Sequence, residues 1–199
     1  MGKRIKHYWD VLQGKAPADL LIKNVKMVHP VGMVIREGSL AIADGRIVGW
    51  TEMPAHKVLD GKGAYLTPGL IDSHIHIEST MLAPTAFARA VIPHGTTAVV
   101  ADPHEVGNVA GLEGLRWMMN QGAEAPFRFF WAAPSCVPAS PLDTPGAILG
   151  ISEIATLLEM EDVVSLGEVM NYPGVIHGDA EVHAKIAAAK SRGLSLIHI

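Results

Sequence analysis

After residue 67 the chain alternates between short apolar runs and longer segments of mixed polarity. The apolar runs predict strands over residues 70–77, 96–101, 127–133 and 163–168. The segments that follow them predict helices over residues 84–94, 112–121, 152–160 and 179–192. Strict alternation of strand and helix predicts a parallel sheet with helices outside it, so the fold class is α/β.

The four predicted strand–helix units are too few for a complete barrel. A TIM-type (β/α)8 barrel typically needs about 250 residues, and residues 67–199 provide half of the eight units. The segment is either a smaller open sheet or the truncated first half of a barrel, and we favour the half-barrel. Its first and fourth strands would be open edges, so we expect the chain as given to be inactive and poorly stable by itself.

The pattern before residue 67 is different. Short apolar runs over residues 20–22, 25–28, 39–42 and 46–50 predict short strands, with Asp44-Gly45 as the tight turn of a hairpin. These strands predict a small, mostly antiparallel β unit that would be marginal alone. We therefore divide the chain into an N-terminal region, residues 1–66, and the half-barrel, residues 67–199.

Composition narrows the classes of partner. Apolar residues make up 49% of the chain and charged residues 18%, with a net charge of −4 and no basic stripe, which argues against nucleic acid. No apolar run approaches the roughly 20 residues of a membrane span, and no secretory signal follows the polar opening. The single cysteine, Cys136, excludes an internal disulfide and a cysteine-rich zinc site. We expect a cytoplasmic protein with no membrane partner.

The sharpest chemical feature is the segment from Asp72 to Glu78, in which polar and apolar side chains alternate. In a strand, His74 and His76 would share one face with both carboxylates, while the isoleucines would pack on helices. Two imidazoles placed in this way can bind one metal ion. The alternative is a polar strand face with two satisfied histidines. Burial of these groups without a metal or partners would be costly, so we favour a metal site.

Two further clusters follow predicted strands, at the edge where parallel α/β folds place their chemistry. Asp102-Pro103-His104-Glu105 follows the second strand, and its alternative interpretation is a helix cap by Asp102 with solvent-facing neighbours. Glu168 ends the fourth strand, where its carboxylate can bridge two metal ions held partly by the histidines. The alternative for Glu168 is an ordinary glutamate at the rim.

The third strand ends in Pro134-Ser135-Cys136. Ser135 can donate a hydrogen bond to a substrate, whereas Cys136 has no partner histidine at a recognisable spacing and is not expected to be a nucleophile. Cytidine-type deaminases combine His-x-Glu with Pro-Cys-x-x-Cys around one zinc ion. A chain with one cysteine cannot contain that second motif.

Residues 68–76, Pro-Gly-Leu-Ile-Asp-Ser-His-Ile-His, resemble the first-strand signature of the amidohydrolase superfamily. The strands around Asp44-Gly45-Arg46-Ile47 resemble part of the small β-sandwich domain that precedes the barrel in that superfamily. Residues 76–81, 101–105 and 167–175 resemble segments of its adenine-deaminating members. The resemblance runs from about Asp10 to Leu194.

This resemblance implies a binuclear site for divalent metal ions, manganese in the first place, with iron or zinc as alternatives. His74 and His76 would bind one ion and Glu168 would bridge the two. A metal-bound hydroxide would attack C6 of adenine, the small-molecule substrate, and yield hypoxanthine and ammonia in purine salvage. His104 and Glu105 would be the catalytic groups on the substrate side. The full-length protein would be a homo-oligomer.

Two alternatives remain open at this stage. One is another amidohydrolase that acts on cyclic amides or N-acyl groups. Such enzymes commonly carry a carboxylated lysine on the fourth strand, where this chain has Glu168 and no lysine. The other is a non-catalytic half-barrel. The superfamily pattern continues with two histidines and a late aspartate that this chain does not contain, and His198 is out of register with the first of them.

Overall fold

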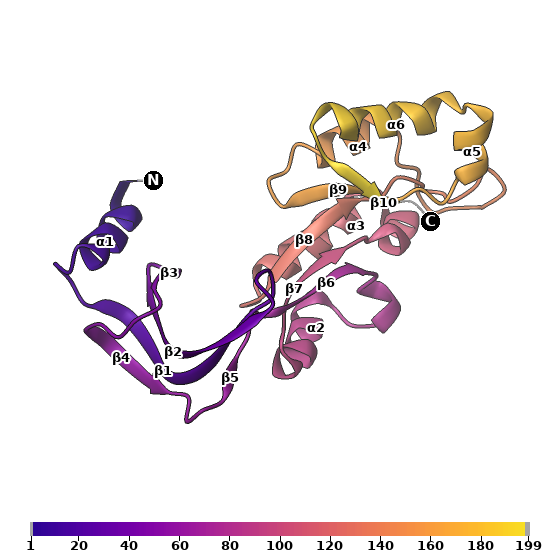
Figure 1. Ribbon diagram of the computed structural model, residues 1–199. Helices are drawn as coiled ribbons and strands as arrows, with labels where there is room; N and C mark the ends of the chain where they lie inside the picture. The colour runs from indigo at the N-terminus through magenta and orange to yellow at the C-terminus, as the bar shows by residue number, and fades with distance from the viewer. Residues whose placement is uncertain (1, 198–199) are drawn as a thin grey trace. The chain divides into compact units, whose positions relative to one another are not determined.

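The computed structural model describes residues 2–197. The chain divides into two compact units, the first ending at Pro68 and the second beginning at Gly69. Figure 1 shows the first unit as a helix and a small sheet, and the second as a sheet with its helices. None of the helices within the described residues is long and apolar enough to span a membrane.

The first unit contains one helix, α1 (Gly2–Leu12), and one sheet of strand order β3-β2-β1-β4, with β5 paired to β1. The strands are β1 (Ala18–His29), β2 (Val34–Ala43), β3 (Arg46–Gly49), β4 (Ala55–Asp60) and β5 (Tyr65–Leu66). Strands β1, β2 and β3 pair antiparallel, but β4 and β5 both pair with β1 in parallel. The predicted strands thus pair antiparallel as expected, and the parallel pairs come from β4 and β5, which the sequence pattern does not predict.

Local backbone conformation explains two details of this sheet. The predicted hairpin at Asp44-Gly45 is confirmed, and both residues have the positive φ values, 51° and 69°, that a two-residue hairpin turn requires. The strand pieces predicted over residues 20–22 and 25–28 are one strand. The pairing register shifts between Ile22 and Val25, where Asn24 has a φ of 54° and interrupts the apolar pattern.

The second unit confirms the predicted parallel α/β arrangement. Its sheet has the order β10-β9-β8-β7-β6, and every neighbouring pair is parallel. The strands are β6 (Leu70–Ile75), β7 (Thr96–Ala101), β8 (Arg128–Ala133), β9 (Val163–Glu168) and β10 (Ser195–Ile197). The expectation that the fourth strand is an open edge is wrong, because β10 pairs with β9. His198 lies outside the described residues.

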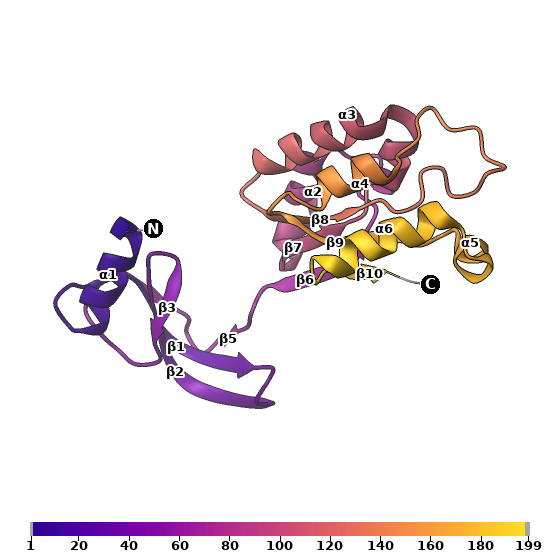
Figure 2. The same ribbon diagram turned by 90° about the horizontal axis from the view of Figure 1, so that it is seen from above.

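The helices of this unit are α2 (Pro84–Val91), α3 (His104–Ala123), α4 (Ile151–Leu157), α5 (Tyr172–His177) and α6 (Ala180–Ser191), with short 3-10 turns η1 (Glu78–Thr80) and η2 (Ile92–His94). Helix α3 starts earlier than predicted, at His104, and is kinked at Gly111. Its glycines lower helix propensity, so the sequence pattern does not predict residues 104–111 as helix. In Figure 2, α3 is seen along its length above β7 and β8.

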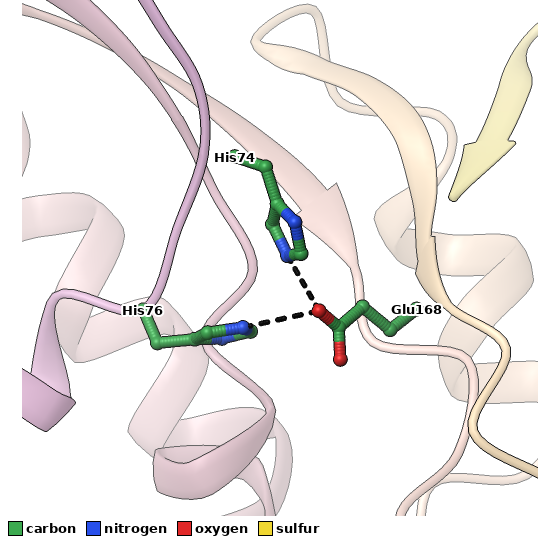
Figure 3. A group of neighbouring side chains, drawn as sticks. All are labelled: His74, His76 and Glu168. Atoms are coloured by element: carbon green, nitrogen blue, oxygen red, sulfur yellow. Dashed lines mark hydrogen bonds and ion pairs between the residues drawn. The ribbon is translucent and has the colours of Figure 1, made fainter. Parts of the chain in front are cut away.

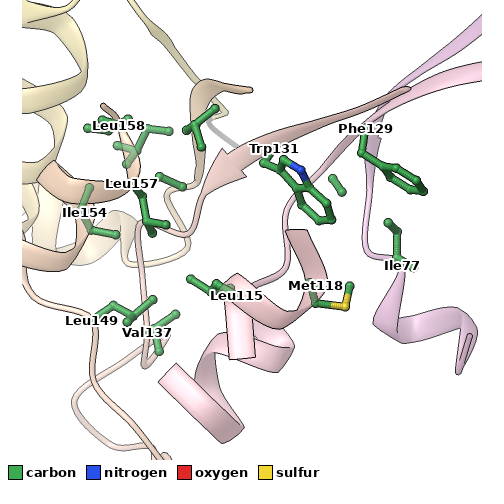
Figure 4. Packing of buried hydrophobic residues seen from close by; sticks show 14 of the residues in the cluster. Ile77, Leu115, Met118, Phe129, Trp131, Val137, Leu149, Ile154, Leu157 and Leu158 are labelled. Atoms are coloured by element: carbon green, nitrogen blue, oxygen red, sulfur yellow. The ribbon is translucent and has the colours of Figure 1, made fainter. Parts of the chain in front are cut away.

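The core of the second unit lies where the sheet meets its helices. Leu115 and Met118 of α3 are fully buried; Met118 lies next to Trp131 of β8, and Leu115 lies near Val137 and Leu149 (Figure 4). The rings of Phe129 and Trp131 are stacked, with centroids 5.7 Å apart. Large side chains packed in this way remove much apolar surface from water, which stabilises the sheet against its helices.

Strand β6 is shorter and more exposed than the alternating pattern predicts. It ends at Ile75, because Ile77 leaves the sheet and its carbonyl accepts hydrogen bonds at the start of η1. Ile77 is fully buried as expected, but Ile71 is 64% exposed. The prediction that Ile71 packs on helices is therefore wrong. β6 is an edge strand of the described sheet, and nothing in the described residues covers that position.

Replacement of Leu115 tests this core. We expect Leu115→Ala to lower the free energy of unfolding by about 2–5 kcal/mol, because it leaves a cavity beneath the sheet. Val109→Ala is the matched control on the same helix, where the side chain is 77% exposed and the expected change is below about 0.5 kcal/mol. Urea denaturation followed by circular dichroism measures both. Equal effects would contradict the described packing.

Candidate metal centre

Three side chains predicted to bind metal meet at the carboxyl ends of the parallel strands. His74 lies in β6, His76 directly follows that strand, and Glu168 is the last residue of β9. Parallel strands direct their carboxyl ends to one edge, so residues far apart in sequence converge there. Figure 3 shows both imidazoles directed at the same oxygen of the Glu168 carboxylate.

The distances within this cluster are short. Oε1 of Glu168 lies 2.9 Å from Nε2 of His74 and 3.3 Å from Nε2 of His76. The two rings meet edge to face, with centroids 4.9 Å apart. The potential ligand atoms of the three residues all lie within 4.8 Å of one another, which is the spacing that a single metal ion needs. The structure therefore brings together the predicted metal residues.

The hydrogen bonding of His76 defines which of its nitrogens is available. Nδ1 lies 2.7 Å from the backbone carbonyl oxygen of Asp102. A carbonyl only accepts hydrogen bonds, so Nδ1 carries a proton, and in the neutral ring Nε2 presents a lone pair. This arrangement, with one nitrogen bonded to a carbonyl and the other directed at a carboxylate oxygen 3.3 Å away, is typical of metal-binding histidines.

The other acceptors point to the same place. Nε2 of His74 is buried and has no hydrogen-bond partner in the described part of the chain, although Glu168 Oε1 is near. Nε2 of both imidazoles and Oε1 of the Glu168 carboxylate thus converge on one point. A cation between them satisfies all three groups at once. The residues therefore fit a divalent metal ion.

Asp102 and His104 lie beside the cluster. Asp102 is 1% exposed, and the backbone N–H of Glu168 donates to its Oδ2 at 2.7 Å. Its Oδ1 lies 3.8 Å from Nδ1 of His104, and this carboxylate raises the pKa of that imidazole against the opposing effect of burial. The rings of His104 and His76 meet edge to face at 4.5 Å.

The alternative interpretation of Asp102 as a helix cap is wrong, because the residue at the cap position of α3 is Pro103. Glu78 serves the helix instead. Its Oε1 accepts hydrogen bonds from the backbone N–H groups of Glu105 and Val106, at 3.1 and 3.4 Å. Burial raises the pKa of the Glu78 carboxyl. Glu78 therefore helps to fix the start of α3, which carries His104.

Glu105 lies less close to the centre than His104. Its side chain is exposed, and its Oε1 accepts a hydrogen bond of 2.6 Å from the Ser79 hydroxyl. It is not one of the three residues that share the metal spacing. The structure thus brings His104 against the ligand His76, whereas Glu105 faces solvent at the start of α3.

Ser135 and Cys136 form hydrogen bonds with the backbone of Glu168 and of Asn171, respectively. The buried Ser135 hydroxyl donates to the backbone carbonyl of Glu168. Its proton is used within the protein, so the expected hydrogen bond to a substrate is not supported. Cys136 is also buried, and its Sγ accepts from the N–H of Asn171. The sequence does not predict that Ser135 and Asp102 bind the backbone of Glu168; their positions at strand ends are the only sequence signal for these contacts.

Comparison with known proteins identifies the family to which the chain belongs. Residues 65–199 match the model of the amidohydrolase family, and the chain belongs to this family. Amidohydrolases are metal-dependent enzymes, in accord with the cluster of two histidines and a glutamate. The predicted resemblance is confirmed.

Two curated relatives show how similar the chain is in sequence to individual proteins. The chain is 50% identical over 184 residues to an adenine deaminase of Nitratidesulfovibrio vulgaris (strain DP4), covering 92% of this chain and 32% of that protein. It is 44% identical over 193 residues to an adenine deaminase of Methanothrix thermoacetophila, covering 97% of this chain and 34% of that protein. The chain spans about a third of the length of these relatives.

Two solved structures share the fold. One is an N-acyl-D-glutamate deacylase from Bordetella bronchiseptica, with a TM-score of 0.61 and 19% identity, covering 92% of this chain and 45% of that one. The other is an N-isopropylammelide isopropylaminohydrolase from Burkholderia multivorans, with a TM-score of 0.60 and 22% identity, covering 91% and 52%. These likenesses confirm the predicted fold class, an α/β half-barrel of the TIM type.

Removal of either imidazole tests the metal centre. We expect His74→Ala and His76→Ala each to weaken binding of Mn²⁺ to the chain by more than the roughly 10- to 100-fold typical of an outer partner, because each removes a direct ligand. Isothermal titration calorimetry measures the affinity. His94→Ala, an exposed histidine at the end of η2, is the control and should bind as the unchanged chain does. Unchanged affinity in both cluster variants would refute the metal assignment.

Proposed function

We propose that this chain supplies metal ligands of an adenine deaminase, which hydrolyses adenine to hypoxanthine and ammonia. The observation that carries the proposal is the convergence of His74, His76 and Glu168 on one point at the rim of the parallel sheet. The sequence identity to proteins named adenine deaminase supports the choice of substrate within the amidohydrolase family. We further propose a role in purine salvage in the cytoplasm.

His74 and His76 would hold one divalent ion, and Glu168 would share it through Oε1. A carboxylate has two oxygens, and we propose that Glu168 would use them to bridge two ions. Bound to these residues, the metal would supply a nucleophile at neutral pH by lowering the pKa of water. We propose manganese, with iron or zinc as alternatives, because imidazole and carboxylate ligands accept all three.

The residues around the ligands keep them in the state that binding needs. The hydrogen bond from His76 Nδ1 to the Asp102 carbonyl leaves Nε2 free for the ion. The Ser135 hydroxyl and the Asp102 carboxylate hold the carbonyl and the N–H of Glu168, respectively. The glutamate is thereby fixed on both sides of its backbone, and its side chain reaches the two imidazoles.

We assign His104 and Glu105 to the substrate side of the site. His104 packs against the ligand His76, where an imidazole can hold a proton at a ring nitrogen and pass it to a bound base. Glu105 faces solvent at the start of α3, and its carboxylate is held by the Ser79 hydroxyl. A substrate approaching the rim from solvent would meet both groups.

A chimera tests the proposed reaction. The 184 residues of this chain that align with the Nitratidesulfovibrio vulgaris adenine deaminase would replace the matching segment of that enzyme. We expect the Mn²⁺-loaded chimera to release ammonia from adenine, and Glu168→Gln within it to reduce the rate to background, because the shared negative ligand is lost. Glu113→Gln, a highly exposed position of α3, is the matched control and should retain the rate.

Ammonia would be measured with adenine, adenosine and cytosine as substrates, and circular dichroism would establish that each variant is folded. A folded, metal-loaded chimera that deaminates adenosine or cytosine but not adenine would refute the proposed substrate. Equal rates before and after Glu168→Gln would refute the proposed role of this glutamate.

A further inference from the structure

We propose that Asp102 is the positioning residue of the metal centre: it orients the ligand His76 through its backbone carbonyl and the ligand Glu168 through its carboxylate. The inference rests on the proposed metal centre and deepens it. Asp102 directly follows β7 and therefore lies at the same sheet edge as both ligands, which belong to the regions of β6 and β9.

The backbone of Asp102 fixes the β6 side. Its N–H donates to the carbonyl of Ile75 at 3.0 Å, immediately before His76. Its own carbonyl accepts the Nδ1 proton of that histidine at 2.7 Å. These two contacts place the imidazole relative to the end of β7 and leave its Nε2 directed at Glu168. They act where β6 has already ended, so the sheet itself does not orient His76.

The side chain of Asp102 fixes the β9 side. The N–H of Glu168 donates to Oδ2 at 2.7 Å, across 66 residues of sequence. Gly167 leaves the space for this contact. A Cβ at that position would lie 2.7 Å from Cγ and Oδ1 of Asp102 and still closer to Oδ2, distances that real Cβ atoms essentially never show. The glycine and the aspartate therefore form a matched pair.

A merely structural link between strands does not explain the choice of an aspartate. The side chain is 1% exposed, its Oδ1 has no hydrogen-bond partner within residues 2–197, and Nδ1 of the His104 imidazole lies 3.8 Å from it. Burial of a carboxylate with so few donors costs free energy that an apolar residue would not. What the aspartate provides in return is a fixed acceptor for the backbone of a metal ligand.

Four single variants and one double variant of the chain test the inference, with Mn²⁺ alone as the probe and isothermal titration calorimetry as the measurement. We expect Asp102→Ala to lower Mn²⁺ affinity about 10- to 100-fold, as removal of an outer partner does. Asp102→Asn keeps an oxygen acceptor in the same place and should recover most of the affinity. Gly167→Ala should lower affinity, because its methyl group displaces the carboxylate. Ser165→Ala, a buried hydroxyl of β9 without a partner in the described residues, is the control.

The combination Asp102→Ala/Gly167→Ala should bind no more weakly than Asp102→Ala alone, since the added methyl group then has room. Thermal melting of each variant establishes folding, and Gly167→Ala with Asp102→Asn keep the test decisive if Asp102→Ala does not fold. Affinity within twofold of the unchanged chain in folded Asp102→Ala would overturn the inference and leave the metal centre standing. An equal loss in Asp102→Asn and Asp102→Ala would also overturn it. Absence of Mn²⁺ binding by the unchanged chain would instead overturn the proposed function.

Discussion

Parallel pairing of β6 through β10 is the constraint on which the site depends. Each strand of this sheet runs in the same direction, so every carboxyl end lies at one edge, and the residues that follow the strands meet there. His76 and Glu168 are separated by 92 residues in sequence, and the sheet brings their side chains to 3.3 Å. The buried layer of Leu115, Met118 and Trp131 holds the strands in this order. The same parallel pairing of the strands therefore underlies both the packing of the core and the positions of the candidate metal ligands.

Nitrogen and oxygen atoms that can bind a metal ion gather at this edge, which is why we propose a metal centre there. Two imidazole nitrogens and a carboxylate oxygen facing one another are unfavourable neighbours without a positive charge between them. Of the five buried side-chain polar atoms without a hydrogen-bond partner in the described residues, four belong to residues gathered at this edge: His74, Glu78, Asp102 and His104. Functional sites are where local rules of stability are most often broken. The family to which the chain belongs accords with that interpretation, because its members depend on metals.

The elements that the sequence predicted well are those whose own residues determine them. The predicted bounds of β7 and β9 coincide with the structure, because each is a short run rich in apolar residues, most of which are buried. Helix α3 is longer than predicted, since Gly107 and Gly111 disfavour helix in the sequence, and Gly111, with a φ of 59°, forms the kink. Strand β10 is a three-residue element whose pairing with β9 defines it, and β4 and β5 likewise depend on β1. Such pairing has no local signature.

The candidate site shows the same division between local and tertiary causes. Strand alternation predicts that His74 and His76 lie on one side, and both do reach Glu168. Alternation explains only His74, however, because β6 ends at Ile75 and His76 lies beyond the sheet. The orientation of His76 comes from the carbonyl of Asp102, and that contact spans 26 residues.

The sequence suggests a helix cap as the alternative role of Asp102, because a sequence pattern reveals only contacts between residues that are close along the chain. Its partners, the N–H of Glu168 and the space above Gly167, exist only once β7 and β9 are placed in one sheet. Residue types at strand ends therefore indicate that a site exists, whereas the groups that aim its ligands follow from the tertiary fold.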